Sequence, residues 1–204
     1  MRYLILFVLV LSGSSLFSQK NNEPKRYSEQ EPAYEYAETL TIDSSVYYTD
    51  TVIRWMTIQE MEAAQKVLPK KVVVSVYATW CRWCRQEDSV VYRNKEVAHY
   101  INQHYYAVKF NAETRTPIIF KGNEYTFNKD ENVFVHQLAQ YLLNGKMQYP
   151  GIVFLDEKLS LIGTQSGYTE APYLESLLNY YGSNAYRKMP FGNFDYEFEG
   201  KIKP

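Results

Sequence analysis

This sequence of 204 residues has little net charge, few cysteines and glycines, and no long apolar run. The formal net charge is −1, so no basic surface for nucleic acid or for an anionic membrane is expected. The apolar run Tyr3–Leu11 is far shorter than the roughly 20 residues of a membrane-spanning helix. No glycine-rich loop that could cradle a phosphate is present. These features argue against nucleic-acid partners, a membrane span and nucleotide chemistry.

The two cysteines of the chain, Cys81 and Cys84, are three residues apart. They follow the apolar run Val72–Val76 and precede a helix-like pattern. Because a helix N-terminus carries partial positive charge and unpaired N–H groups, it stabilises a thiolate, and Arg82 and Arg85 add full positive charges. The thiolate is the attacking species in disulfide exchange. The spacing therefore predicts a redox pair in which Cys81 attacks and Cys84 resolves.

The cysteine pair has three other interpretations. A zinc site needs four ligands, and the three histidines show no ligand spacing; they are His99, His104 and His136. A structural disulfide across four residues would stabilise the fold by only about 2 kcal/mol. A permanently reduced, buried pair would suit a cytosolic protein. Redox exchange accounts for the pair best.

The first 18 residues have the pattern of a signal peptide. Arg2 supplies the positive start, Tyr3–Leu11 the apolar segment, and Ser12–Ser18 the small residues before a cleavage site. A short membrane anchor is the alternative, but the apolar segment is far shorter than a membrane span. No cysteine follows it, which argues against a lipoprotein anchor. We expect export to the periplasm with no stable membrane insertion after cleavage. In such an oxidising compartment, a single Cys-x-x-Cys is either a catalyst or the substrate of one.

The remaining chain divides into a polar leader or linker over 19–50, a domain over 51–182 and a tail over 183–204. A first strand is expected from Val46 through Ile53, and Trp55-Met56-Thr57 is expected to open a helix. Thr57 with Glu60 three residues later is a capping-box pattern. The aromatic, acidic tail has no predicted structure.

Strands and helices alternate through the domain. Strands are predicted over 71–78, 105–110, 150–156 and 159–165, and helices over 81–92, 94–103, 133–143 and 169–182. The long connection 111–145 is predicted to be an insertion with a small hairpin over 117–127. This order predicts an α/β fold whose mixed central sheet has helices on both faces.

The segment from about 55 to 181 resembles the thioredoxin superfamily. The resemblance depends on a strand, the motif Trp80-Cys81-Arg82-Trp83-Cys84, a helix, a strand, and an X-Pro pair before a hairpin and a closing helix. The stretches 106–113 and 149–156 are most similar to exported thioredoxin-like proteins of Bacteroidetes-type bacteria and to the terminal domain of thiol-disulfide interchange proteins. The resemblance implies a thioredoxin-like fold with an insertion, over 111–145, between the second and third core strands.

The resemblance also implies roles for residues around the cysteines. Pro150 should be cis and should pack opposite the pair, so that Tyr149 offers its backbone N–H and C=O to a substrate. Trp80 should shield one side of the thiol, although an ordinary core aromatic is the alternative. Arg82 and Trp83 replace the Gly-Pro of thioredoxins and should also contact substrates. Arg82 should lower the pKa of the thiol and favour the reduced form.

Other departures concern the proton path. Thioredoxins usually carry a buried Asp on the strand before the motif, where this chain has Ser75. Lys109 stands where the family places a lysine near that carboxylate. Glu87 is a candidate substitute base, with an exposed position on a solvated helix face as the alternative. Gly151 stands where a threonine usually follows the proline, which could leave extra room for substrate.

The sequence thus predicts an exported thiol-disulfide oxidoreductase that forms mixed disulfides with protein substrates, acting as a reductase. Its expected partners are protein thiols and disulfides and an unidentified upstream electron donor or acceptor. No metal, nucleotide or flavin cofactor is implied. The alternative is a thioredoxin-fold binding module in which the cysteine pair takes no part.

Overall fold

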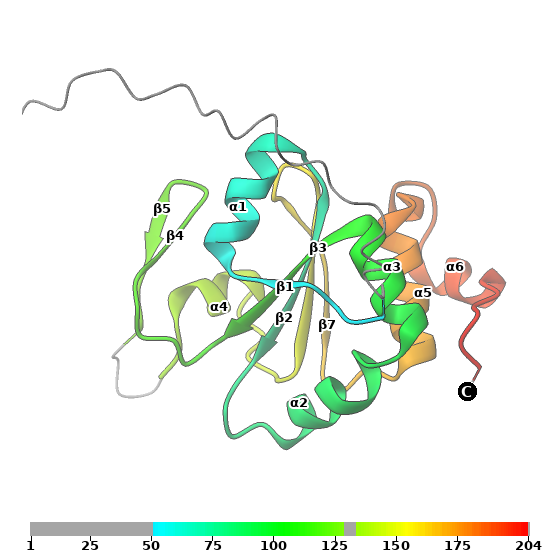
Figure 1. Ribbon diagram of the computed structural model, residues 1–204, viewed down its shortest axis with the longest axis horizontal. Helices are drawn as coiled ribbons and strands as arrows, with labels where there is room; N and C mark the ends of the chain where they lie inside the picture. The colour runs from blue at the N-terminus through cyan, green and yellow to red at the C-terminus, as the bar shows by residue number, and fades with distance from the viewer. Residues whose placement is uncertain (1–50, 129–133, 204) are drawn as a thin grey trace, which may run out of the picture. The chain divides into compact units, whose positions relative to one another are not determined.

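The computed structural model describes residues 51–128 and 134–203 of the chain (Figure 1). The predicted signal peptide over 1–18 and the polar leader over 19–50 lie outside the described residues. Within the described residues, no helix combines the length and the apolar character that a membrane span requires.

A five-stranded mixed sheet forms the centre of the described fold. Its strand order is β1-β3-β2-β6-β7, and the pairs β1–β3 and β3–β2 are parallel while β2–β6 and β6–β7 are antiparallel. This arrangement confirms the predicted mixed sheet. The strands are β1 (Trp55–Met56), β2 (Lys71–Tyr77), β3 (Tyr105–Asn111), β6 (Gly151–Leu155) and β7 (Leu161–Ser166).

Strand β2 occupies the middle of the sheet because its sequence is apolar on both faces. Val72, Val74 and Val76 pack into one core, while Val73 packs into the core on the opposite face. Ser75 is also buried, with 1% of its surface exposed. A strand that is buried on both sides reads as a continuous β-branched run, which is the pattern of this segment.

Helices cover both faces of the sheet, as predicted (Figure 1). Ile58, Met61 and Leu138 bring two of them, α1 (Ile58–Val67) and α4 (Gln137–Leu142), into the core that holds Val74. On the other face, α3 (Lys95–His104) and α5 (Ala171–Gly182) bury their apolar stripes beside Val73. The sheet is therefore a middle layer between two helical layers.

The start of the fold differs from the sequence prediction in two respects. Val52 and Ile53 lie in no strand, and positions 46–50 of the strand expected there are outside the described residues. Trp55 and Met56 form β1 and pair with Ala107 and Val108 of β3, so they do not open the helix as expected. The helix begins after Thr57, whose hydroxyl oxygen accepts from the N–H of Glu60 at 3.2 Å. The Glu60 carboxylate in turn accepts from the N–H of Thr57 at 2.7 Å. The predicted capping box is thus confirmed.

The connection between β3 and β6 contains the predicted hairpin, as β4 (Ile118–Phe120) and β5 (Asn123–Tyr125). Its two-residue turn, Lys121-Gly122, has φ values of 53° and 76°, and Gly122 tolerates this left-handed backbone without strain. The predicted helix over 133–143 is shortened to α4, because the side chain of His136 caps it by accepting the N–H of Leu138. Since α4 packs on the sheet, part of this segment belongs to the core.

Later boundaries also shift. Leu159 has a φ of 58° and lies in the turn, so β7 begins at Leu161 and not at Leu159 as expected. The predicted helix over 81–92 consists of α2 (Arg82–Gln86) and a π-helical turn, η2 (Glu87–Val91). The tail, for which the sequence predicted no structure, forms η3 (Ala185–Arg187) and α6 (Phe191–Glu197).

Candidate active site

Cys81 and Cys84 form a disulfide where β2 leads into α2, with their Cα atoms 5.3 Å apart. Cys81 occupies the N-cap position of α2, and its sulfur accepts a hydrogen bond from the backbone N–H of Cys84 at 3.0 Å. The exposed fractions of the two residues are only 3% and 2%. The sequence expectation of a cysteine pair at a helix start is therefore confirmed.

The turn that leads to Cys81 is held by side chains from two directions. The Glu113 carboxylate accepts from both the backbone N–H and the hydroxyl of Thr79, each at 2.5 Å. These hydrogen bonds lower the pKa of Glu113 and keep it ionised. From the helix side, the Arg85 guanidinium donates to the Thr79 carbonyl at 3.1 Å. The loop before the disulfide is thus fixed on both sides.

Two exposed tryptophans flank the disulfide. Trp80 and Trp83 have 68% and 58% of their surface exposed, so the alternative of a core aromatic does not hold for Trp80. Each ring rests on a tyrosine: Trp80 lies edge-on to Tyr149 with centroids 5.9 Å apart, and Trp83 lies 5.4 Å from Tyr168. Sequence reasoning missed Tyr168, because nothing distinguishes it among 20 tyrosines.

The Tyr149–Pro150 peptide bond is cis, as the resemblance implied. Tyr149 packs against the small buried cluster of Ala78, Cys81 and Cys84, which brings the residue before the proline beside the disulfide. The Pro150 carbonyl accepts from the N–H of Gly167 at 2.8 Å. Within the described residues, the backbone N–H and C=O of Tyr149 take part in no backbone hydrogen bond. These two groups are therefore available to an extended segment beside the disulfide.

Arg82, the first residue of α2, is exposed next to Cys81. Its guanidinium is always charged at neutral pH, so the site has a positive charge at the helix start in addition to the helix dipole. Arg82 completes the set of predicted site residues. These residues lie on the turn before α2, on α2 itself and on the loop before β6.

A polar cluster connects β2, β3 and η2. The Lys109 ammonium donates to the Ser75 hydroxyl at 3.2 Å and forms a short ion pair with Asp88. The ammonium also lies over the rings of Trp55, Tyr77 and Tyr92, at 4.9–5.3 Å from their centroids. The lysine of the resemblance is thus retained, with Ser75 in place of the usual carboxylate.

Glu87 lies inside the protein with 1% of its surface exposed, so it does not face solvent. One carboxylate oxygen accepts from the backbone N–H of Thr169 at 3.3 Å. The other oxygen has no hydrogen-bond partner among the described residues. Burial raises the pKa of Glu87 to about 7, and the nearby Tyr92 hydroxyl, Thr169 and Lys109 offset part of this rise.

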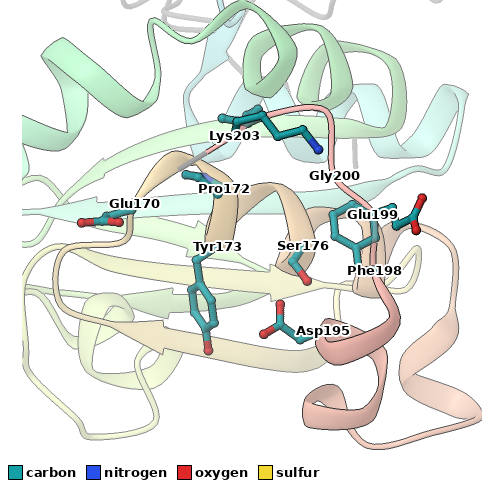
Figure 2. Close-up of a pocket in the computed structure, with 10 residues that line it drawn as sticks. Glu170, Pro172, Tyr173, Ser176, Asp195, Phe198, Glu199, Gly200 and Lys203 are labelled. Atoms are coloured by element: carbon teal, nitrogen blue, oxygen red, sulfur yellow. The ribbon is translucent and has the colours of Figure 1, made fainter.

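A cavity of about 670 Å³ lies away from the disulfide, and neither cysteine lines it. It lies between α5, α6 and the C-terminal segment, where Tyr173, Ser176 and Asp195 line it (Figure 2). No group of three or more potential metal ligands occurs in the described part of the chain.

The sequence matches a family model described as "Thioredox_DsbH: Protein of unknown function, DUF255" over residues 38–125. This segment includes the cysteine pair and the strands β2 and β3, which form the middle of the sheet. Over these residues, the chain is similar to that family. The order of the strands in the mixed sheet and the helices on both of its faces agree with the predicted thioredoxin-like fold.

Several solved structures are similar to this chain. A thioredoxin-fold protein from Helicobacter pylori is 15% identical over 74% of this chain and 93% of its own, with a TM-score of 0.48. A disulphide isomerase from Xylella fastidiosa is 21% identical over 68% of this chain and 82% of its own, with a TM-score of 0.38. The C-terminal domain of DsbD from Neisseria meningitidis, in the reduced form, is 21% identical over 62% of this chain and 91% of its own, with a TM-score of 0.39. The sequence has no significant match among curated proteins.

Proposed function

We propose that the chain is an exported thiol-disulfide oxidoreductase that exchanges disulfides with protein substrates through Cys81 and Cys84. One observation carries the proposal: the disulfide lies at a helix start, beside a cis-proline and between two exposed tryptophans. A disulfide that only braced the fold would gain little from closing a four-residue loop and would need no such surroundings.

In the reduced enzyme, Cys81 is the nucleophile. The N–H of Cys84, the helical segment from Arg82 to Val91 and the Arg82 charge all favour its thiolate. The Cys81 thiolate attacks a substrate disulfide, which forms a mixed disulfide and releases one substrate sulfur as a thiolate. The Cys84 thiolate then attacks the Cys81 sulfur, closes the Cys81–Cys84 bond and releases the second substrate sulfur.

The surface around the disulfide supports a polypeptide substrate. The backbone groups of Tyr149 can pair with an extended substrate segment, as in the addition of a strand to a sheet edge. Trp80 and Trp83 offer large apolar faces on either side, each supported from below by a tyrosine ring. Pro150 and Arg82 complete the contact surface. We therefore assign substrate binding to these five residues.

The direction and the compartment belong to the same proposal. The resemblance to thiol-disulfide interchange proteins supports a reductase that is supplied with electrons by an upstream protein. The segment 1–18 supports export to the periplasm, with 19–50 as a leader that separates the domain from the cleavage site. Arg82, by stabilising the thiolate, would raise the reduction potential of the pair.

The test is to trap substrates on the chain. With Cys84→Ser, we expect Cys81 to hold partners as mixed disulfides that appear on non-reducing gels of cell-envelope extracts. Cys81→Ser should form none and should lose all exchange activity. If Cys81→Ser retained its partners and the Cys84→Ser variant trapped none, the chain would be a binding module with an inactive cysteine pair.

Equilibration with glutathione buffers tests the direction. A reduction potential near about −270 mV would match that of thioredoxin and support a reductase, whereas a value near about −120 mV would indicate a disulfide donor. Arg82→Gln should shift the potential toward more negative values, because the thiolate loses a neighbouring positive charge.

A further inference from the structure

We propose that the Glu87 carboxylate accepts the proton of the Cys84 thiol when Cys84 resolves the mixed disulfide. This inference rests on the proposed thiol-disulfide exchange, and it assigns the proton acceptor for the second step. The position that the resemblance would give to a buried acid holds Ser75, whose hydroxyl cannot accept a proton at neutral pH.

Cys84 and Glu87 share the inward face of one continuous helical segment. Along α2 and η2, the buried residues are Cys84, Glu87 and Val91, which recur at the spacing of a single helix face. Glu87 lies one turn after Cys84, and its N–H donates to the Cys84 carbonyl. Helix geometry therefore directs the carboxylate to the same side of the helix as the buried sulfur of Cys84.

The carboxylate has a free oxygen on this buried face. One oxygen is fixed by the Thr169 N–H, which comes from the loop before α5, while the other has no partner in the described part of the chain. The fully buried Tyr92 hydroxyl lies near Glu87 and Ser75 but makes no hydrogen bond of standard geometry. An unpaired buried oxygen is costly in a fold, and a role in proton transfer explains why it is present.

The charges around Glu87 leave it able to bind a proton near neutral pH. Lys109, on β3, is the cation that acts on it, but the ammonium is paired with Asp88. Asp88 itself acts on Glu87 with the opposite sign. Burial is the largest influence on Glu87 and raises its pKa to about 7, although the Tyr92 hydroxyl and the Thr169 N–H act in the opposite direction. An acid with such a pKa can both take and release protons under physiological conditions.

The other acids near the site are less suited to this role. Asp88 is partly exposed and bound to Lys109. Glu113 is held by the Thr79 hydrogen bonds, which lower its pKa, and it lies at the turn before Cys81. His136 is buried, but both of its ring nitrogens are engaged, with Thr116 and Leu138. Glu87 is the acid in this group that combines burial, a free oxygen and a place one turn from Cys84.

The proposed step balances in protons and electrons. The Cys84 S–H bond breaks and its proton moves to Glu87, while the Cys84 sulfur attacks Cys81. The Cys81–Cys84 bond forms, the bond from Cys81 to the substrate sulfur breaks, and the substrate leaves as a thiolate. Glu87 then returns its proton to water. In the reverse direction, protonated Glu87 gives its proton to Cys84 as the disulfide opens.

Stopped-flow kinetics with an aromatic disulfide reagent can separate the two steps, because each releases one coloured thiolate. The full mature chain is reduced and mixed with 5,5′-dithiobis(2-nitrobenzoate) between pH 5 and 9; the fast phase reports the attack by Cys81 and the slow phase the resolution by Cys84. For the unmodified chain, we expect the slow phase to accelerate through an inflection near pH 7. With Glu87→Gln, this inflection should disappear and the slow phase at pH 7 should fall at least tenfold, while the fast phase stays unchanged.

Two further variants keep the test decisive. Glu87→Asp retains a titrating carboxyl and should retain an inflection. Glu175→Gln alters another buried glutamate, which accepts the N–H groups of Lys201 and Ile202, and should leave the pH profile unchanged. A slow phase in Glu87→Gln with the same rate and inflection as in the unmodified chain would overturn this inference. The absence of both phases in the unmodified chain would instead overturn the proposed function.

Discussion

Burial gives one glutamate of this chain properties that glutamates at the surface do not have. Glu87 lies near Lys109 of β3 and Thr169 of the loop before α5, and its charged form loses most of its hydration there. The same desolvation that suits the residue for proton transfer also destabilises the fold when the carboxyl is ionised. The two effects can be measured separately, one in kinetics and one in unfolding.

Glu87 should make the stability of the oxidised chain depend on pH. Its pKa is about 7 in the folded protein against an ordinary 4.5, so the folded state binds more protons between these values. The contribution of Glu87 to the free energy of unfolding is therefore fully present below about pH 4.5. This contribution is lost as the pH rises through 7, and the free energy of unfolding falls by on the order of 3 kcal/mol. Urea unfolding at pH 5 and pH 8 should show Glu87→Gln to be more stable than the unmodified chain only at pH 8. An equal difference at both pH values would contradict this expectation.

At the residue scale, the sequence indicated the two cysteines and their neighbours but not the environment of each side chain. The motif around Cys81 is local, and its position at a helix start follows from residues nearby. The exposure of Trp80 and the burial of Glu87 depend on segments far along the chain. Thr169, which binds Glu87, is 82 residues away from it in sequence.

Among the secondary-structure elements, α1 shows how short patterns set boundaries. The capping box of Thr57 and Glu60 fixes the first turn and separates α1 from the two-residue strand β1. β1 was not predicted at its true position, because two residues are too few to show a strand period. It forms through pairing with Ala107 and Val108 of β3.

Removing the cap of α1 should weaken the whole domain, because α1 covers one face of the sheet. Thr57→Ala leaves the N–H of Glu60 without its acceptor, and we expect a loss of about 1 kcal/mol in the free energy of unfolding. Thr57→Ser, which keeps the hydroxyl, is the matched control and should remain close to the unmodified chain. Urea denaturation followed by circular dichroism measures both. An unchanged midpoint for Thr57→Ala would show that the cap contributes nothing.

In the helical segment after Cys81, the sequence pattern predicted a helix but not its internal geometry. The sequence predicted one helix there, and the structure has α2 followed by the π-helical turn η2, where the N–H of Tyr92 bonds to the Glu87 carbonyl. π-helical turns within helices are frequent at functional sites. The wider turn begins at Glu87, which lies against Thr169.

For the molecule as a whole, the C-terminal tail completes the outer surface of α5. Tyr180 of α5 contacts the rings of Phe191 and Phe194, and Glu175 accepts the N–H groups of Lys201 and Ile202 at 2.9 Å. Glu175 is 5% exposed, so its carboxylate depends on these two donors. The tail is thus part of the folded unit, although its sequence showed no periodic pattern.

Deleting residues 198–204 should therefore destabilise the domain. The buried Glu175 loses both backbone donors, and Ile202 leaves the apolar cluster against which it packs, so we expect a loss of about 2–4 kcal/mol. Deleting only residues 203–204 preserves these contacts and serves as the control. Thermal unfolding of the two truncated chains gives the comparison. Equal melting temperatures would show that the tail adds no stability.

The sequence by itself determined the features that depend on neighbouring residues. It specified the cysteine pair at the helix start, the buried core strands with their β-branched runs, the cap at Thr57 and the hairpin turn at Gly122. Each of these depends on backbone conformation or apolar pattern within a few residues.

Only the tertiary structure decided the features that depend on contacts between distant segments. It placed Tyr168 beneath Trp83, ordered the tail against α5 and enclosed Glu87 within reach of Thr169, Tyr92 and Lys109. The physical reason is that burial, and the pKa that follows from it, is a property of the whole packed environment. The sequence therefore predicted the nucleophile Cys81, whereas only the folded structure showed the environment of Glu87, the proposed proton acceptor for Cys84.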